Sequence, residues 1–419
     1  MPILQAVHNM PRIKAFKALR PTAELASEVA SVPYDVVNRQ EAAALADGNP
    51  LSFLHVVRPD IDFPPDKNPY DPEIYDKAVA NFQKLIRDGV LQRDPTDCVF
   101  AYRQIMNGRA QVGIVCCVHI DDYENNLILK HEKTRKSKED DRTRHVLALN
   151  ANAGPVFLTY RGEDKINQMV AKAITAAPLY DFTAVDGIQH TVWRIETPQP
   201  FVDALTAVPY FYIADGHHRA ASAWRAGKEL RQRQPGGGTG QEECNWFLSV
   251  LFPSEQLRIL AYNRVLKDTN GHTVSEILEK LDSLGDLEQT TNPDPDAPGS
   301  FCFLIDHRWW KLTIPPDPLF RDDPIRTLDA AILERQVLHP IFGIEDVRTD
   351  PRIDFVGGIR GTAELERLCI GGDWAVGISM VPTTLDQLMA VSDAGEIMPP
   401  KSTWFEPKLR SGLLVHTLD

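Results

Sequence analysis

VPYFYIADGHHRAASAWRAGKELRQR, residues 208–233, is the most informative segment of the chain. Val208–Ala214 is apolar and rich in β-forming residues, and Asp215-Gly216 interrupts this run. Ala220–Arg233 is typical of an Ala-rich helix that ends before Pro235. The expected order is therefore a strand, a tight turn and a helix. At such a junction, a glycine lets a ligand approach the free N–H groups and positive dipole end of the helix, which suits phosphate.

Two histidines and an arginine follow the glycine directly, in the order Gly216, His217, His218 and Arg219. An arginine can offer forked donors to phosphate oxygens, and a histidine can add directional hydrogen bonds. The alternative is that Asp215 only caps the helix, with both histidines satisfied on its first turn. Few structural turns need all of these groups, so we predict that Asp215 to Arg219 bind phosphate or nucleotide.

A second motif, KHEKTR at residues 130–135, opens a charged stretch that runs to about Leu149. Charges spaced four apart along this stretch predict a polar helix. Glu132 is a candidate general base, and His131 and Arg135 are candidate substrate-binding groups. A zinc-protease motif is excluded because Arg135 stands where the second histidine is required. The alternative is a solvated helix face.

A third motif, MPPKSTWF at residues 398–405, joins two prolines to a cation, two hydroxyl groups and two aromatic residues. Lys401, Ser402 and Thr403 can bind a carboxylate, with Lys401 and Thr403 on one side if the segment is extended. The alternative is an ordinary loop that enters an edge strand.

The remaining pattern predicts many strands without a regular alternation of strand and helix, so a mixed α+β fold is expected. Asn107-Gly108 predicts a hairpin, and Asn38 with Glu41 predicts a helix start that leaves Val32–Asp35 in a loop. Further expectations are a strand at Ser52–Pro59 flanked by His55 and Arg58, hairpins at Phe247–Tyr262 and Phe301–Ile314, and helices at Val274–Leu284 and Leu328–Leu338.

The length of 419 residues favours two lobes. The glycine-rich residues 236–243 have the composition of a flexible loop and are the expected boundary. An amino-terminal lobe, 1–235, would carry the HEKTR and DGHHR motifs. A carboxyl-terminal α+β lobe, 244–419, would contribute the Lys401 loop to the site.

Composition limits the class of protein. Apolar residues make up 43% and charged residues 25%, as in an average globular chain. The net charge of −13 argues against a general affinity for nucleic acid. No C-x-x-C spacing occurs among the six cysteines, which are expected to be reduced, and the amino-terminal segment lacks the apolar core of a secretory signal. A cytoplasmic location without membrane partners is expected.

The motifs VPYDVV, SFLHVVRP, KHEKTR, NANAGPVFLTYR, YIADGHHRAASA, LAYNRV and MPPKSTWF, in this order, resemble a large bacterial family known as a domain of unknown function. DGHHRAA is also similar to the phosphate-binding signature of the ParB/sulfiredoxin superfamily, which implies a strand–turn–helix phosphate-binding core. One branch of that superfamily phosphorylates free L-serine. The resemblance to these free serine kinases implies a glutamate base before G-H-H-R and a K-x-T element after it that binds the amino acid. Glu132, Gly216–Arg219 and Lys401-Ser402-Thr403 follow that order, and Asp35 is the rival base.

The resulting hypothesis is ATP-dependent phosphorylation of a free amino acid, L-serine to O-phospho-L-serine. ATP and Mg²⁺ are the expected cofactors, with Asp215 capping the helix or helping to position Mg²⁺; no other metal ligand is assigned. The alternatives are a ParB-like nucleotide-binding switch or DNA-associated regulator without metabolite turnover, and a scaffold that only binds metabolites.

Overall fold

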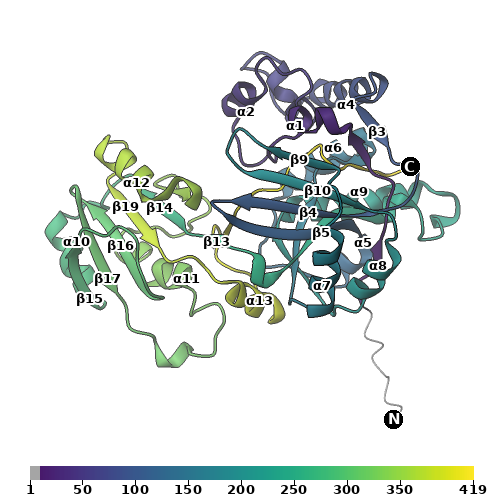
Figure 1. The fold of residues 1–419 in the computed structure, drawn as a ribbon. Coiled ribbons are helices and arrows are strands. Elements are labelled where there is room, and N and C mark those ends of the chain that lie inside the picture. Colours follow the sequence, from purple (N-terminus) through teal and green to yellow (C-terminus); the bar gives the residue numbers. More distant parts are fainter. Residues whose placement is uncertain (1–9) are drawn as a thin grey trace, which may run out of the picture. The chain divides into compact units, whose positions relative to one another are not determined.

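The computed structural model describes residues 10–419, which form two compact units (Figure 1). The first comprises the described residues up to Leu257 together with Pro407–Asp419, and the second comprises Arg258–Glu406. The predicted boundary at 236–243 is therefore wrong. It lies inside the first unit because the strand that follows it, Trp246–Pro253, pairs on both sides within the sheet of that unit. The prediction that the amino-terminal segment lacks a secretory signal concerns a segment that begins within residues 1–9. These residues lie outside the described residues.

The first unit contains a mixed sheet with the strand order β6-β11-β8-β12-β5-β4-β10-β9, and β1 pairs with β5. The pairs β11/β6 and β12/β8 are parallel, and the others are antiparallel. These strands are β1 (Ile13–Lys14), β4 (Val99–Met106), β5 (Arg109–His119), β6 (Ile128–Leu129), β8 (Val156–Tyr160), β9 (Tyr180–Thr183), β10 (Gln189–Ile195), β11 (Phe211–Asp215) and β12 (Trp246–Pro253).

Helices and short strand pairs surround this sheet. The helices are α1 (Ala26–Val29), α2 (Arg39–Ala46), α3 (Leu54–Val57), α4 (Pro72–Arg87), α5 (Ile120–Glu124), α6 (Lys136–Leu149), α7 (Asp164–Ala173), α8 (Gln199–Thr206) and α9 (His217–Arg233). The short strands are β2 (Leu19–Pro21), which pairs with β3 (Leu91–Arg93), and β7 (Ala151–Asn152), which pairs with β21 (His416–Thr417). The last of these pairs ties the end of the chain to the first unit.

Two local predictions for the first unit are confirmed. Asn107 and Gly108 both have positive φ, 52° and 77°, as a two-residue type I′ hairpin requires, and they join β4 to β5. Asn38 accepts from the backbone N–H of Glu41 while the Glu41 side chain accepts from the backbone of Asn38, so α2 begins with the predicted capping box.

Two other local predictions are wrong. Residues 54–57 form the helix α3 instead of a strand, because Phe53, Val56 and Val57 also fit a helical period and are buried together. Phe53 packs edge-on against Phe82 of α4. Phe247–Tyr262 is not a hairpin, because β12 pairs with β5 and β8 while the next strand, β13 (Ile259–Leu260), pairs with β20 (Trp404–Phe405) in the second unit.

The second unit contains an antiparallel sheet with the order β15-β17-β16-β19-β14-β18. Its strands are β14 (Tyr262–Leu266), β15 (Asp286–Thr290), β16 (Ser300–Ile305), β17 (Arg308–Thr313), β18 (Ile353–Gly357) and β19 (Val376–Met380). Its helices are α10 (Val274–Asp282), α11 (Asp329–Leu333), which continues as a π-turn over Glu334–Leu338, α12 (Gly361–Ile370) and α13 (Leu385–Asp393).

The predicted hairpin near Phe301–Ile314 is confirmed by β16 and β17, and the mixed α+β class holds for both units. Over the described part of the chain, no helix combines the length and the apolar character needed to cross a membrane.

Candidate functional site

The strand–turn–helix junction forms as predicted. β11 ends at Asp215, and α9 runs for 17 residues from His217. Gly216 between them has φ 94° and ψ 32°, a left-handed conformation that favours glycine. Among the described residues no side chain caps the start of α9. The helix therefore presents its first amide groups and its positive dipole end without a side-chain acceptor of its own.

Asp215 pairs with two cations instead of capping α9, which corrects the capping alternative. Its Oδ2 accepts from Nη2 of Arg219 at 3.0 Å and lies 3.8 Å from Nζ of Lys408. Burial alone would raise the pKa of Asp215, but Lys408 and Arg219 outweigh it and lower the pKa to about 2. The carboxylate is therefore ionised and already compensated at neutral pH.

This pairing leaves Asp215 poorly suited to Mg²⁺, which is bound through free carboxylate oxygens, water and phosphate. The residues from 10 onward contain no group of three or more His, Cys, Asp or Glu side chains that could hold a metal ion. The donor set at the junction thus fits an anion better than a cation, and the role of Asp215 in positioning Mg²⁺ stays a prediction.

His131 and His217 form a buried pair. Their Nε2 atoms lie 3.4 Å apart, and their rings meet edge to face at 86° with centroids 4.5 Å apart. Burial lowers the pKa of each to about 3, so both are neutral at physiological pH. They pack against each other inside the junction and bring no positive charge to an anion.

His218 connects the junction to the KHEKTR segment. Its Nε2 accepts from the backbone N–H of Arg135 at 3.1 Å. Burial lowers the pKa of His218, and the charges of Glu132 and Asp35 partly oppose this shift. Both candidate bases, which are exposed, therefore lie close enough to His218 to act on it electrostatically.

The predicted helix across 130–149 is wrong at its start, because residues 130–135 form a loop and α6 begins at Lys136. The Thr134 hydroxyl donates to Glu139 in the first turn of α6, and Arg225 of α9 reaches Glu139 at 3.2 Å and Asp140 at 2.6 Å. Lys136 and Asp140, two of the charges spaced four apart, pair at 3.2 Å. The loop thereby places Glu132 and Arg135 beside α9.

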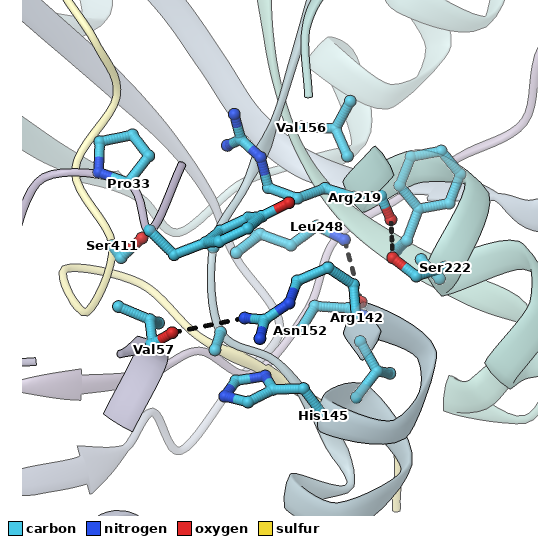
Figure 2. Close-up of a pocket in the computed structure, with 16 residues that line it drawn as sticks. Pro33, Val57, Arg142, His145, Asn152, Val156, Arg219, Ser222, Leu248 and Ser411 are labelled. Carbon is cyan, nitrogen blue, oxygen red and sulfur yellow. Dashed lines mark hydrogen bonds between the residues drawn. The ribbon is translucent and has the colours of Figure 1, made fainter. Parts of the chain in front are cut away.

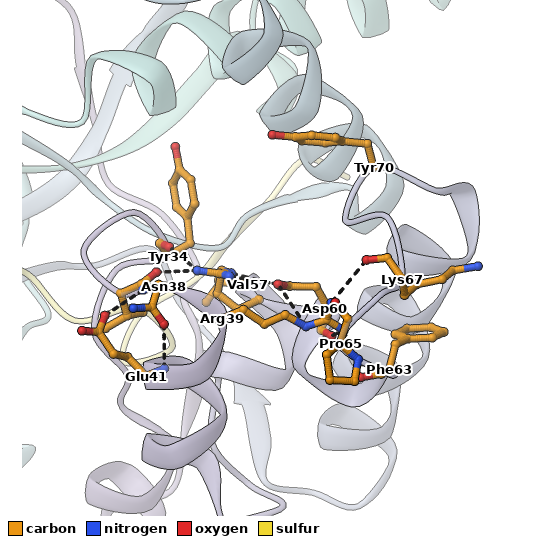
Figure 3. Close-up of polar contacts among 12 residues, drawn as sticks. Tyr34, Asn38, Arg39, Glu41, Val57, Asp60, Phe63, Pro65, Lys67 and Tyr70 are labelled. Atoms are coloured by element: carbon orange, nitrogen blue, oxygen red, sulfur yellow. Dashed lines mark hydrogen bonds and ion pairs between the residues drawn. The ribbon is translucent and has the colours of Figure 1, made fainter. Parts of the chain in front are cut away.

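The loop that contains Asp35 is tied down by arginine side chains. Arg58 donates through Nη1 to the carbonyls of Tyr34 and Val37 at 3.2 and 2.5 Å. The neighbouring Arg39, the first residue of α2, donates to carbonyls of residues 60–67, including that of Phe63 at 2.9 Å (Figure 3).

The Lys401–Thr403 segment lies in the second unit. Lys401 has φ 60°, its Nζ lies 5.2 Å from the ring centroid of Tyr262, and its carbonyl accepts from Nη2 of Arg264 at 3.2 Å. The Ser402 hydroxyl donates to the Pro399 carbonyl at 2.7 Å. Because this loop and the DGHHR junction belong to different units, their joint action stays a prediction.

Several residues at the junction carried no clear signal in the sequence. Lys408 reaches Asp215, and the Pro155 carbonyl accepts from Nη1 of Arg219. A Cβ on Gly154 would lie 3.9 Å from Cδ of Arg219, so the NANAGP turn packs against the arginine. Lys408 lies three residues after the MPPKSTWF motif, and this proximity was the one available hint.

The chain belongs to the family described as "Protein of unknown function (DUF1015)", whose model matches residues 13–331. Among curated proteins no sequence matches the chain.

Distant similarities to solved structures accompany this membership. Free serine kinase in complex with AMP is 14% identical, with a TM-score of 0.35, over 72% of this chain and 91% of the other. A mutant of free serine kinase in complex with ADP is 12% identical, with a TM-score of 0.36, over 72% and 92%. SbnI with a C-terminal truncation, from Staphylococcus aureus, is 13% identical, with a TM-score of 0.38, over 72% and 86%. TM-scores of this size do not establish a common fold.

Proposed function

We propose that this chain is a small-molecule kinase that transfers the terminal phosphate of ATP to the hydroxyl of a free amino acid, with L-serine as the first candidate. The observation that carries the proposal is the uncapped start of α9 at Gly216, beside two exposed carboxylates that act on His218. Oriented amides at a helix start bind phosphate, and a neighbouring carboxylate can accept a proton. The motif order shared with free serine kinases, and the ParB/sulfiredoxin-like core it implies, agree with this reading.

In this mechanism the turn at Gly216 and the backbone amides of His217 to Arg219 hold the polyphosphate. The hydroxyl oxygen of the amino acid attacks the terminal phosphorus, the bond to the bridging oxygen breaks, and ADP leaves. Glu132 or Asp35 accepts the hydroxyl proton. Asp215 holds Arg219 in place, and its own charge is neutralised, so it does not repel the phosphates. Phosphoryl transfer depends mainly on alignment and charge stabilisation, which these groups can supply.

Lys401, Ser402 and Thr403 are proposed to contact the amino acid, with His131 packing behind the site and Arg135 at its edge. ATP is the proposed donor, and ADP and pyrophosphate are tested beside it.

The test incubates the purified chain with ATP, MgCl₂ and each amino acid in turn and detects phosphorylated product by mass spectrometry. O-phosphoserine is the expected product. No product with serine or threonine from any donor would reject the kinase. Nucleotide binding that no amino acid affects would instead favour the binding switch, and salt-dependent retention on DNA would favour the DNA-associated regulator.

The base is identified with Glu132→Gln and Asp35→Asn, which keep the shape of each side chain and remove its basicity. The variant that loses the base should lose at least a hundredfold in kcat while it binds ATP normally. The other variant is the matched control.

A further inference from the structure

A small cavity lies in the first unit beside the start of α9 (Figure 2). Its volume is about 40 Å³, and its wall includes Tyr34, Arg142, His145, Arg219 and Ser411. Within the described residues, this wall contains two arginines and no carboxylate. The cavity therefore offers hydrogen-bond donors and lacks an acidic side chain.

Arg219, which lines the cavity, has an unused donor. Its side chain is 10% exposed, Nη1 donates to the Pro155 carbonyl, and Nη2 donates to Asp215. Its Nε is buried and has no hydrogen-bond partner among the described residues. A buried donor without an acceptor typically costs about 1–3 kcal/mol, so a ligand oxygen here would relieve a real penalty.

Arg142 supplies the second guanidinium. Its side chain is 12% exposed, Nε donates to Asp141 at 2.8 Å, and Nη1 donates to the Val57 carbonyl at 3.3 Å. These bonds use two of its five N–H groups. The guanidinium lies 4.3 Å from the ring centroid of Tyr34, and burial raises the pKa of Tyr34, so this phenol keeps its proton.

The volume of the cavity limits the size of the chemical group that it can hold. One water-sized group needs about 10–15 Å³ by this measure, so the cavity holds about three such groups. A carboxylate has three heavy atoms and fits. A phosphate or a nucleotide is too large.

We propose that this cavity binds the carboxylate of the amino-acid substrate, with Arg142 and the Nε of Arg219 as donors. The inference rests on the proposed kinase and deepens it, because it assigns the carboxylate to the first unit and leaves Lys401 to contact another part of the substrate. Asp141 and Asp215 pair with the two guanidiniums from outside the wall, so binding depends on directed hydrogen bonds more than on net charge. Burial lowers the pKa of Arg219, and the charges of Asp35 and Asp215 outweigh it, so Asp35 acts on Arg219 electrostatically and is the candidate base near a substrate held here.

The test measures binding of L-serine and of L-serinamide, which lacks the carboxylate, to the full-length protein by calorimetry. The wild type should bind L-serine at least tenfold more tightly than L-serinamide. Arg142→Met should weaken L-serine binding at least tenfold, leave L-serinamide binding unchanged, and leave the Kd for ATP unchanged. Arg144→Met is the matched control, because Arg144 is exposed on the same helix, and it should bind L-serine as the wild type does.

Equal binding of the two ligands by the wild type would overturn the inference, as would an Arg142→Met variant with unaltered affinity for L-serine. Absence of any binding would overturn it too. The comparison of the two ligands on the wild type needs no variant, so it decides the question even if Arg142→Met does not fold. Tight L-serine binding that depends on Arg142, without any phosphorylated product, would show that the kinase proposal fails while the cavity proposal stands.

Discussion

Gly216 occupies a position that combines a backbone requirement with a close contact. Its φ of 94° is one that side-chain-bearing residues rarely adopt, and a Cβ there would lie 2.9 Å from Nε of Arg219. The absence of a side chain therefore lets Arg219 fold back over the turn and reach Asp215.

Gly216→Ala should strain the turn by about 1–3 kcal/mol and displace Arg219. We expect the Kd for ATP to rise at least tenfold, measured by calorimetry, with a lower thermal midpoint. Gly108→Ala is the control, because it imposes a comparable strain at φ 77° with nothing within 4 Å of the added carbon. If both variants bound ATP equally well, the junction would not be the nucleotide site.

Buried histidines make stability depend on pH. Burial lowers the pKa of His131, His145, His190 and His217 to about 3, whereas an unfolded histidine titrates near 6.5. Between these values the unfolded chain binds more protons than the folded one. The neutral histidines therefore contribute their full stability above about pH 6.5, and this contribution is lost as the pH falls towards 3.

Denaturant unfolding at pH 7.5, 6.0 and 5.0 should show this loss, with each histidine contributing up to about 1.4 kcal/mol per pH unit. His145→Gln should flatten the slope by about one proton, because His145 contacts the Val56 carbonyl through Nε2 at 2.8 Å and a glutamine amide can replace that contact. An unchanged slope in this variant would mean that His145 is protonated in the folded state.

At the scale of elements, arginine side chains hold the loops that present the candidate base. Arg58, which follows α3, binds two carbonyls of the Asp35 loop and pairs with Asp60 at 2.9 Å. Arg39 donates to carbonyls of residues 60–67, including those of Asp60 and Phe63. Arg58 belongs to the SFLHVVRP motif, so this motif positions the loop that contains VPYD. The motif therefore has a structural role.

Arg58→Met should release residues 33–37, seen as faster amide hydrogen exchange, and lower kcat about tenfold or more if Asp35 is the base, because small misplacements of a reacting group are costly. Arg39→Met lowers stability through the 60–67 loop and should leave kcat near the wild-type value. Equal activity of the two variants, with exchange of 33–37 altered, would argue for Glu132 instead.

Motifs with a local cause were predictable at this scale. The Asn107-Gly108 hairpin, the Asn38 capping box and the β11–α9 junction depend on backbone preferences within a few residues, so the sequence contains their whole cause. The strand expected at Ser52–Pro59 and the helix expected at 130–135 failed because contacts with distant elements outweighed weak local patterns. Phe53 packs on Phe82, and the Arg135 backbone N–H donates to His218.

At the scale of the whole molecule, the second unit is a continuous segment between two parts of the first. Its buried core, which includes Leu281, Phe301, Phe303, Leu333 and Ile378, is drawn from its own residues. The first unit is closed by the end of the chain, where Val415 and Leu19 exchange two backbone hydrogen bonds of 2.9 Å.

Residues 258–406 expressed alone should therefore unfold in one cooperative transition, followed by circular dichroism. A chain that ends at Leu257 should be far less stable than the full protein, because it lacks the strand β21 that pairs with β7 and the Lys408 that reaches Asp215. A non-cooperative transition in the 258–406 fragment would mean that its sheet needs the rest of the chain.

Local chemistry was enough to predict the α+β class, the strand–turn–helix junction at Gly216 and the family. The residues that contact this turn from distant parts of the chain could not be predicted from local chemistry. His131 and His217 are 86 positions apart, and the whole second unit lies between Asp215 and Lys408 in the sequence. Backbone preferences act between residues that are close in the sequence, so they can be recognised in short motifs. Burial and charge pairing act between surfaces that meet only once the chain has folded, so the contacts of Arg142, Pro155 and Lys408 became clear only in the folded structure.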